Sequence, residues 1–599
     1  MRAAGGWFGK TECCVLALLL CAGAMATAHA RPAPAKAAVA THDSERDWWK
    51  NAVIYEIYPR SFQDSNGDGI GDLNGITSRL DYLQALGVDA IWLTPCYPSP
   101  QVDFGYDISD YRNIDPQYGT LADFDHLVAE AAKHHIRVLM DMVMNHTSDQ
   151  HQWFLESRSS RANRYRDWYV WRDGKGETAA DKGQPPNNWQ SYFGHSAWQW
   201  DEKTRQYYYH KFYIQQPDVN WSNPKIHQAF KDIIAFWLQR GVGGFRFDAI
   251  TTLYEDPKLT DEGVVKDKNG NPVINAYCDP QLDDSKTNNL PGVHAVMQEM
   301  RAAADKFNSD SFPGTRVLIG ETYLPNAAEL EKMYGPPGKP EFELPMDTQV
   351  GFINQLDVAK FRARLIDAEA KIGGHTPLLL FDNHDNPRID LRYGDGVHDT
   401  EIQGALATVL FASRGAALFY YGDEIGMKTT PPARKEDVKD PIGIIGWPKE
   451  KGRDGERTPM QWNAETNAGF SAATATWLPV PSSATTINVK AEESDPDSLL
   501  NWYRALIRLK KTNAAMAHGT NVMLDTQNTK VLSWLREASG EAPVVVSVNF
   551  TAEPQTVNLA AGVKAGSLYT LLKSPGGADP ASLDSIELGP FGVYIGEVR

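Results

Sequence analysis

Residues 241–249 have the sequence Gly-Val-Gly-Gly-Phe-Arg-Phe-Asp-Ala, and this stretch is the clearest indication of the fold in the sequence. The apolar run from Gly244 to Phe247 predicts a short buried strand that ends on the carboxylate of Asp248. The glycines before it permit a tight turn and a close approach of neighbouring backbones. An acid at the carboxyl end of a barrel strand indicates catalysis, and a buried ion pair with Arg246 is the structural alternative.

Seven further strand-like stretches alternate with helix-like segments. The predicted strands, together with 244–247, are 52–58, 88–93, 136–143, 316–320, 342–346, 378–381 and 416–421. The predicted helices are 76–86, 121–134, 223–240 and 499–510. Eight strands alternating with helices are typical of an α/β protein built as a parallel (β/α)₈ (TIM) barrel.

Two segments do not follow this alternation. Residues 146–219 are rich in Trp, Tyr, Gly and Asn and have little periodicity, which predicts an insertion after the third strand, either a small domain or a lid. Short alternating runs beyond residue 514 predict a C-terminal antiparallel β-sandwich over 514–599. The barrel is therefore predicted to comprise residues 46–145 and 220–513.

The N-terminus has the features of a secretory signal. In residues 1–30, a positively charged start precedes an apolar run over 15–25, which is too short to span a membrane as a mature helix. Ala28-His29-Ala30 offers a small-x-small cleavage site. We therefore expect a periplasmic or secreted protein without a membrane anchor in its mature form, preceded by a disordered Ala/Pro-rich lead-in over 31–45.

Composition limits the partners. The 599 residues are too many for one core, so two or three domains are expected, and the formal net charge of −17 without a basic cluster argues against nucleic acid. Three of the five cysteines lie in the signal. The other two, Cys96 and Cys278, form either one disulfide or two separate buried thiols. We expect a monomer or homodimer that uses no organic cofactor.

Three acids follow predicted strands four, five and seven: Asp248, Glu321 and Asp385. The carboxyl ends of barrel strands share one mouth, so the three side chains converge. Cleavage of a glycosidic bond needs one carboxylate as nucleophile or base and another as acid, and a third can stabilise the positive charge. Arg246 predicts an ionised Asp248, whereas the apolar run before Glu321 predicts a raised pKa for that acid.

Several segments are diagnostic in combination. They are Asp141-Met-Val-Met-Asn-His146, Gly244-Phe-Arg-Phe-Asp248, Gly320-Glu321, Phe381-Asp-Asn-His-Asp385, Gly105-Tyr-Asp107 and Arg457-Thr-Pro-Met-Gln-Trp462. Through them the chain resembles the α-amylase family of retaining glycosidases (glycoside hydrolase family 13), in its branch of α-glucosidases and oligo-1,6-glucosidases. The resemblance covers nearly the whole mature chain, and it implies Asp248 as nucleophile, Glu321 as general acid/base and Asp385 as transition-state stabiliser.

The same resemblance implies a set of sugar-binding residues. Around the glucose unit at the −1 subsite it places His146, Arg246 and His384 as hydrogen-bonding groups and Tyr106 as a stacking ring. It also implies that Asp107 and Arg457 close the pocket behind the non-reducing end. A pocket closed at that end would release one glucose at a time.

A loop near the N-terminus has the oxygen ligands of a cation site. Asp64, Asn66 and Asp68 have the first spacings of an EF-hand, but Gly75 stands where its closing glutamate belongs. The resemblance implies a structural Ca²⁺ or Mg²⁺ ion bound by Asp64, Asn66, Asp68, Asp72 and the carbonyl of Ile70. An ordinary Asp/Asn/Gly-rich turn without metal is the alternative.

Two features disagree about the bond that is cleaved. Within the branch, Ala or Thr after the nucleophile accompanies α-1,4 action and Val accompanies α-1,6 action, since a β-branched side chain narrows the +1 subsite. Ala249 therefore favours α-1,4, whereas Gln216-Pro-Asp-Val-Asn-Trp221 resembles the oligo-1,6-glucosidases. We expect an exo-α-glucosidase acting on maltose and other small oligosaccharides, with transfer to other alcohols competing with water. An oligo-1,6-glucosidase, a glucosyltransferase, a glucoside isomerase or a non-catalytic transporter-associated relative are the alternatives.

Overall fold

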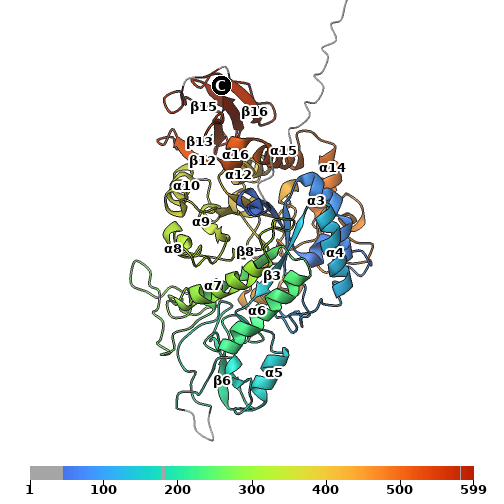
Figure 1. Ribbon diagram of the computed structural model, residues 1–599, viewed down its shortest axis with the longest axis vertical. Coiled ribbons are helices and arrows are strands. Elements are labelled where there is room, and N and C mark those ends of the chain that lie inside the picture. The colour runs from blue at the N-terminus through green and yellow to red at the C-terminus, as the bar shows by residue number, and fades with distance from the viewer. Residues whose placement is uncertain (1–44, 177–181, 565, 581) are drawn as a thin grey trace, which may run out of the picture. The chain divides into compact units, whose positions relative to one another are not determined.

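A computed structural model describes residues 45–176, 182–564, 566–580 and 582–599. In it, eight parallel strands close into a barrel in the order β1-β11-β10-β9-β8-β7-β3-β2, which confirms the predicted (β/α)₈ architecture (Figure 1). The strands are β1 (Val53–Ile57), β2 (Ala90–Leu93), β3 (Arg137–Val143), β7 (Gly244–Asp248), β8 (Val317–Gly320), β9 (Leu344–Asp347), β10 (Leu378–Leu379) and β11 (Ala416–Tyr420).

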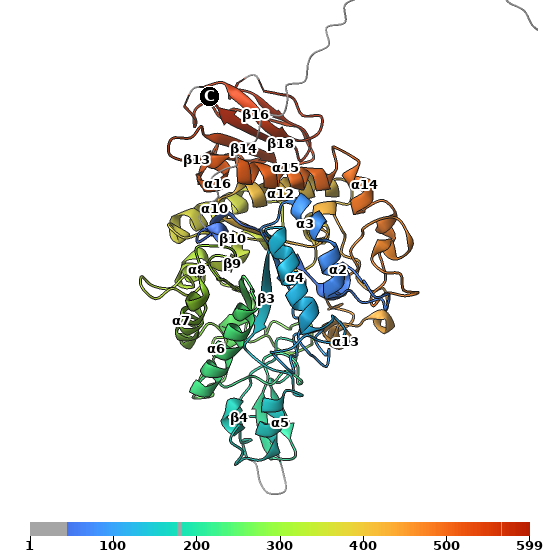
Figure 2. The ribbon, with the colours of Figure 1, turned by 45° about the vertical axis from the view of Figure 1, so that its right-hand side comes forward.

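Helices flank the strands, and Figure 2 shows two of them, α4 and α6, beside β3. The main ones are α2 (Leu73–Ser78), α3 (Leu80–Leu86), α4 (Leu121–Lys133), α6 (Pro224–Gln239), α7 (Gly292–Ala304), α10 (Val358–Ile372), α12 (Asp399–Ala412) and α15 (Leu499–Thr512). The helix predicted over 76–86 is divided into α2 and α3, because Arg79 leaves the helical conformation with φ −107° and ψ 9°. Asp72 caps α2 by accepting a hydrogen bond from the backbone N–H of Gly75.

Strand pairing positions the acids that the sequence singles out. In the register of β3 with β7, Asp141 lies opposite Arg246 and Val143 opposite Asp248. Gly244 is required at the next pairing, because a Cβ atom there would lie 2.0 Å from the carbonyl oxygen of Val317. The close backbone approach predicted for the glycines therefore occurs between β7 and β8.

The insertion has a core of its own, which distinguishes a small domain from a simple lid. It contains α5 (Gln152–Ser159) and a three-stranded sheet in the order β4-β6-β5. These strands are β4 (Trp171–Arg172), β5 (Trp198–Asp201) and β6 (Gln206–Tyr209). A buried cluster separate from the barrel core holds the sheet together and includes Trp189, Trp198, Trp200, Tyr207 and Tyr209.

The C-terminal domain has two antiparallel sheets, as predicted. Five strands run in the order β12-β13-β14-β18-β16, and β15 pairs with β17. Their bounds are β12 (Thr520–Leu524), β13 (Val531–Glu537), β14 (Val544–Asn549), β15 (Gln555–Val557), β16 (Leu568–Lys573), β17 (Ile586–Leu588) and β18 (Val593–Val598). The predicted start at residue 514 is six residues early, because Ala514–His518 forms helix α16.

Three expectations about the chain ends and the cysteines meet different outcomes. The predicted signal and residues 31–44 lie outside the described residues, but Glu45 accepts a hydrogen bond from Arg137 and so is not part of a disordered lead-in. Cys96 and Cys278 are both free thiols, and Cys278 is exposed rather than buried. Among the helices of the described ranges, none has the length and apolar character to cross a membrane.

Candidate active site

The three predicted catalytic acids line one cavity at the carboxyl ends of the barrel strands. Asp248 ends β7, Glu321 follows β8, and Asp385 lies beyond β10. The cavity has a volume of about 370 Å³. Its wall includes Tyr106 from the barrel, His146, Tyr192, Phe193 and Phe212 from the insertion, and Ala249, Asn288, Tyr323 and Asn386.

The buried side chain of Arg246 contacts two of the three acids, Asp248 and Glu321. Its Nη1 donates to Oδ1 of Asp248 at 2.8 Å and to both oxygens of Asp141, at 3.0 and 3.1 Å. Its Nη2 lies 2.5 Å from Oε1 of Glu321. The side chain has no exposed surface and lies over the ring of Trp92, with 4.8 Å between the guanidinium carbon and the ring centroid. One guanidinium therefore brings the predicted nucleophile and the predicted acid/base side by side.

Burial has the largest effect on the two central acids. It raises the pKa of Asp248 to about 7, with further increases from Asp141 and Asp385, although Arg246 opposes the rise. Arg246 lowers the pKa of this acid, as its place beside Asp248 predicts, but the cost of burying the charge is larger, so the pKa lies above its ordinary value. For Glu321 the expected rise is confirmed, since burial raises its pKa to about 7 against the pull of Arg246.

Asp385 has the opposite electrostatic environment. Burial alone would raise its pKa, but the neighbouring His384 ring and the charges of Arg453 and Arg457 lower it well below the ordinary value. Nη1 of Arg453 and Nη2 of Arg457 both donate to its Oδ1, at 2.8 and 2.7 Å. Asp385 is therefore ionised at neutral pH, where Asp248 and Glu321 titrate.

The predicted sugar-binding residues divide into two groups. Tyr106 and His146 line the cavity. Burial lowers the pKa of His146 to about 3, so this ring is neutral at working pH. Arg246 and His384 have no exposed surface and lie behind the cavity wall. The ring of His384 stacks on Tyr106 at 5.2 Å with 5° between the planes.

The structure corrects the pair predicted to close the pocket. Asp107 is buried and accepts hydrogen bonds from Ser99 Oγ and from the backbone N–H groups of Val102 and Asp103. Arg457 is also buried, and its Nε donates to the carbonyl of His384 at 2.7 Å.

The charged pair on the cavity wall is Asp103 with Arg453, at 2.7 Å. Arg453 also contacts Asp440 at 2.7 Å. Each member stands four residues before the residue that was predicted, in the same loop. Asp107 and Arg457 support these loops from behind, which explains why their motifs are close to the site without lining it.

The loop over residues 64–72 satisfies the chemistry of a cation site in part. Asp64 Oδ1 accepts from the N–H of Asn66, Asn66 Oδ1 from that of Asp68, and Asp68 Oδ1 from that of Ile70. These bonds wind the loop so that oxygen-bearing residues recur at every second position, and an all-oxygen set suits Ca²⁺ or Mg²⁺. Within the described ranges, no group of three or more His, Cys, Asp or Glu side chains is arranged for a metal. A cation here would therefore depend on Asn66 and the Ile70 carbonyl as well as on the acids.

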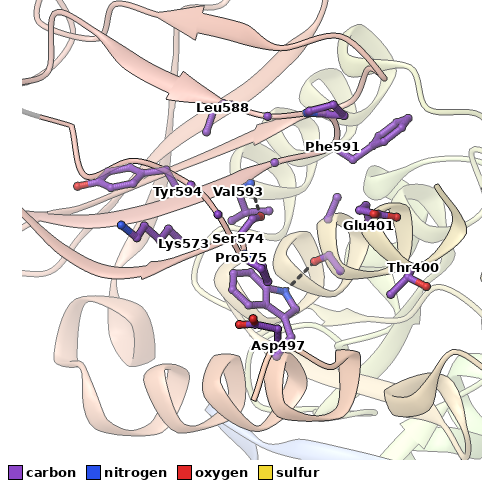
Figure 3. A pocket seen from close by; sticks show the side chains of 18 of the residues that line it. Thr400, Glu401, Asp497, Lys573, Ser574, Pro575, Leu588, Phe591, Val593 and Tyr594 are labelled. Atoms are coloured by element: carbon purple, nitrogen blue, oxygen red, sulfur yellow. Dashed lines mark hydrogen bonds between the residues drawn. The ribbon is translucent and has the colours of Figure 1, made fainter. Parts of the chain in front are cut away.

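A second cavity, of about 580 Å³, lies between the barrel helices α12 and α15 and the C-terminal sheets (Figure 3). Its lining includes Glu401, Trp502, Lys573, Phe591 and Tyr594. None of the residues predicted for the site belongs to it. Cavity volume alone therefore does not locate the chemistry, and the convergence of acids does.

Comparison with known proteins agrees with this geometry. The family model described as alpha amylase, catalytic domain, matches residues 56–519. The chain belongs to the α-amylase family. A probable alpha-glucosidase of Rhizobium meliloti is 41% identical over 528 residues, which cover 86% of this chain and 92% of that protein. An oligo-1,6-glucosidase of Parageobacillus thermoglucosidasius is 37% identical over 584 residues, covering 93% and 100%.

Among solved structures of the α-amylase family, the alpha-glucosyl transfer enzyme XgtA is similar with a TM-score of 0.82 and 36% identity, over 92% of this chain and 99% of that one. The chain is thus a glycoside hydrolase of the α-glucosidase and oligo-1,6-glucosidase branch. Glu56, whose Oε1 lies 2.6 Å from Nδ1 of His384, is a residue beside the site that sequence reasoning missed, and so are Asp103 and Arg453 on the cavity wall. A charged residue inside the apolar stretch 52–58 was a usable signal for the first of them.

The pKa values predict a narrow, bell-shaped dependence of kcat/KM on pH, centred near neutrality. Below about pH 7 Asp248, the predicted nucleophile, gains a proton, and above about pH 7 Glu321, the predicted acid/base, loses its proton. Because the two groups interact, the limbs belong to the pair rather than to either residue. We expect Glu321→Gln to lower kcat/KM on maltose by about 10²- to 10⁴-fold and to abolish the alkaline limb. An alkaline limb that persists in a folded Glu321→Gln protein would contradict this assignment.

Proposed function

We propose that this glycoside hydrolase is a retaining, exo-acting α-glucosidase with a preference for short α-1,4-linked substrates such as maltose. The observation that carries the proposal is the single guanidinium of Arg246, which contacts both Asp248 and Glu321. Retaining glycosidases need their two carboxyl groups close together, whereas inverting ones leave room for a water molecule between acid and base. Two acids sharing one guanidinium favour the retaining arrangement.

In the proposed reaction Glu321 protonates the leaving oxygen while Asp248 attacks the anomeric carbon and forms a β-glucosyl ester. Glu321, now a carboxylate, then removes a proton from water, which attacks the same carbon and releases α-glucose. Asp385 remains ionised and stabilises the positive charge that develops on the sugar. The hydrogen bond from the backbone N–H of Ala249 to Glu321 Oε2, 2.8 Å long, orients this acid for both steps.

Exo action is supported by the buried cluster on the cavity wall. Arg453 contacts Asp103, Asp385 and Asp440, at 2.7, 2.8 and 2.7 Å, and so ties three loops together. Charged groups that are paired in this way do not separate easily, since breaking such a pair leaves an unpaired buried charge. We propose that this wall stops the non-reducing end of the substrate after one glucose unit.

The α-1,4 preference is supported by Ala249. This residue lines the cavity and has φ 43° and ψ 39°, in the left-handed region that β-branched residues disfavour. The segment from Gln216 to Trp221, which favours α-1,6 action, contacts a different part of the site. Gln216 donates to Asp103 at 2.9 Å and lies 3.1 Å from Nε2 of His146, so it supports the inner wall rather than the acceptor subsite. An oligo-1,6-glucosidase is the alternative that this segment favours.

We further propose that the loop with Asp64, Asn66, Asp68, Ile70 and Asp72 binds Ca²⁺ or Mg²⁺ as a structural ion. Its support is the oxygen donor set and the winding of the loop by side-chain hydrogen bonds. Export to the periplasm or medium is likewise a proposal, and it rests on the sequence of residues 1–30.

The proposed linkage preference predicts the outcome of parallel time courses on maltose and isomaltose, with the sugars resolved by chromatography. We expect kcat/KM to be about tenfold or more higher for maltose, because Ala249 leaves the +1 subsite open. Asp248→Ala is the inactive control. Glucose released mainly from isomaltose would support the oligo-1,6-glucosidase alternative, and early trisaccharide or a rearranged disaccharide would indicate a transferase or isomerase.

If the proposed cation is structural, chelation should lower the thermal stability of the protein and leave the catalytic acids unchanged. Treatment with EDTA should lower the melting temperature, and added Ca²⁺ at about 100 times its Kd should restore about 2.7 kcal/mol of folding free energy. In Asp68→Ala the melting temperature should no longer respond to either reagent. A melting temperature that is equal with and without EDTA in the wild-type protein would refute the cation site.

A further inference from the structure

Glu56 is a charged residue inside a barrel strand, and the reaction described above does not use it. It lies in β1 with no exposed surface. Its Oε1 is 2.6 Å from Nδ1 of His384, and its Oε2 has no hydrogen-bond partner among the described residues. A buried carboxylate anion with a bare oxygen is costly, whereas a neutral carboxyl group tolerates this position far better.

The other nitrogen of His384 points toward the chemistry. Nε2 is buried, has no hydrogen-bond partner in the described part of the chain, and lies 3.3 Å from Oδ2 of Asp385. The imidazole is stacked between the rings of Tyr58 and Tyr106, with centroid distances of 5.9 and 5.2 Å. Its plane is therefore fixed, and only the positions of its protons remain to be decided.

Those positions follow from the neighbours. Asp385 is an ionised acceptor, so an unprotonated Nε2 facing it would place a lone pair against a negative charge. A proton on Nε2 removes this conflict and leaves Nδ1 of a neutral ring as an acceptor. The 2.6 Å contact then requires a proton from Glu56 Oε1.

The surrounding charges agree with this proton count. Burial raises the pKa of Glu56 well above its ordinary value, with Asp385 and Asp382 adding to the rise, and with Arg246 and the hydrogen bond from the backbone N–H of His384 opposing it. Burial also lowers the pKa of His384, with Arg457, Arg246 and Arg453 adding to the decrease and Asp385 opposing it. Both shifts favour a neutral acid donating to a neutral ring.

We propose that Glu56 is a positioning residue that donates a proton to Nδ1 of His384 and thereby fixes the tautomer whose Nε2–H faces Asp385 and the −1 sugar. This inference rests on the proposed role of Asp385 in glucoside cleavage. Arg453 and Arg457 donate to Oδ1 of Asp385, and the Nε2–H of His384 faces Oδ2 of the same acid at 3.3 Å. Glu56 thus acts through His384 and does not itself touch the substrate.

Two substitutions of Glu56 distinguish the effect of its hydrogen bond to His384 from the effect of its size. In Glu56→Gln the amide NH₂ can still donate to Nδ1, so the tautomer is kept. In Glu56→Leu a side chain of similar size has no donor, and Nδ1 must take the proton or remain unpaired. The readouts are kcat and KM for p-nitrophenyl α-glucoside, after the wild-type protein has been shown to release glucose from it.

We expect Glu56→Leu to lower kcat by about 10- to 100-fold, by analogy with the partners that orient metal-bound histidines. KM should change much less, and Glu56→Gln should lose less than about tenfold. Equal losses in both variants, or no loss in Glu56→Leu, would overturn the proposal. If instead the wild-type protein releases no glucose, the proposed function fails rather than this inference.

A second measurement does not depend on the folding or the kinetics of the Glu56 variants. Nitrogen-15 spectra of wild-type protein labelled at histidine, with His384→Asn used for assignment, report which ring nitrogen carries a proton. We expect a protonated Nε2 and an acceptor-type Nδ1 for His384. A protonated Nδ1 with a bare Nε2 would overturn the proposal whatever the kinetics of the variants.

Discussion

The buried guanidinium of Arg246 is the interaction on which the site depends. It has three carboxyl partners, Asp141, Asp248 and Glu321, and the register of β3 with β7 places Asp141 directly opposite Arg246. A lone buried cation would be costly, and so would each acid without it. The arginine therefore lowers the cost of burying a cluster of acids inside the barrel. Two of these acids, Asp248 and Glu321, line the cavity side by side.

A second group of cations acts on Asp385 and has the opposite consequence. Arg453 and Arg457 both contact one oxygen of this acid, so its pKa falls well below the ordinary value, while the acids above Arg246 titrate near neutral pH. The separation of these pKa values assigns different tasks to similar side chains. A permanently charged acid suits charge stabilisation, and acids that titrate near pH 7 suit attack and proton transfer. Glu56 extends this scheme one layer deeper, through His384.

The sequence predicted the architecture because strand endings and acids coincide. Apolar runs located all eight strands, and Asp248, Glu321 and Asp385 follow three of them, so their convergence required no knowledge of side-chain packing. Finer placement failed where packing decides. Asp107 and Arg457 belong to diagnostic motifs, yet the residues that face the cavity are Asp103 and Arg453, each four residues earlier in the same loop. The raised pKa of Asp248 could not be predicted, because a sequence shows the neighbouring arginine but not the depth of burial.

Asp248 is proposed to attack the sugar and to form a covalent ester beside Glu321. Incubation with 5-fluoro-α-glucosyl fluoride, a substrate whose glycosyl-enzyme intermediate breaks down slowly, tests it directly by mass spectrometry of the intact and digested protein. We expect one fluoroglucosyl group to be added to the wild-type protein, on Asp248, and none to be added to Asp248→Ala. Modification of a different carboxylate, or turnover of the reagent without any covalent adduct, would contradict it.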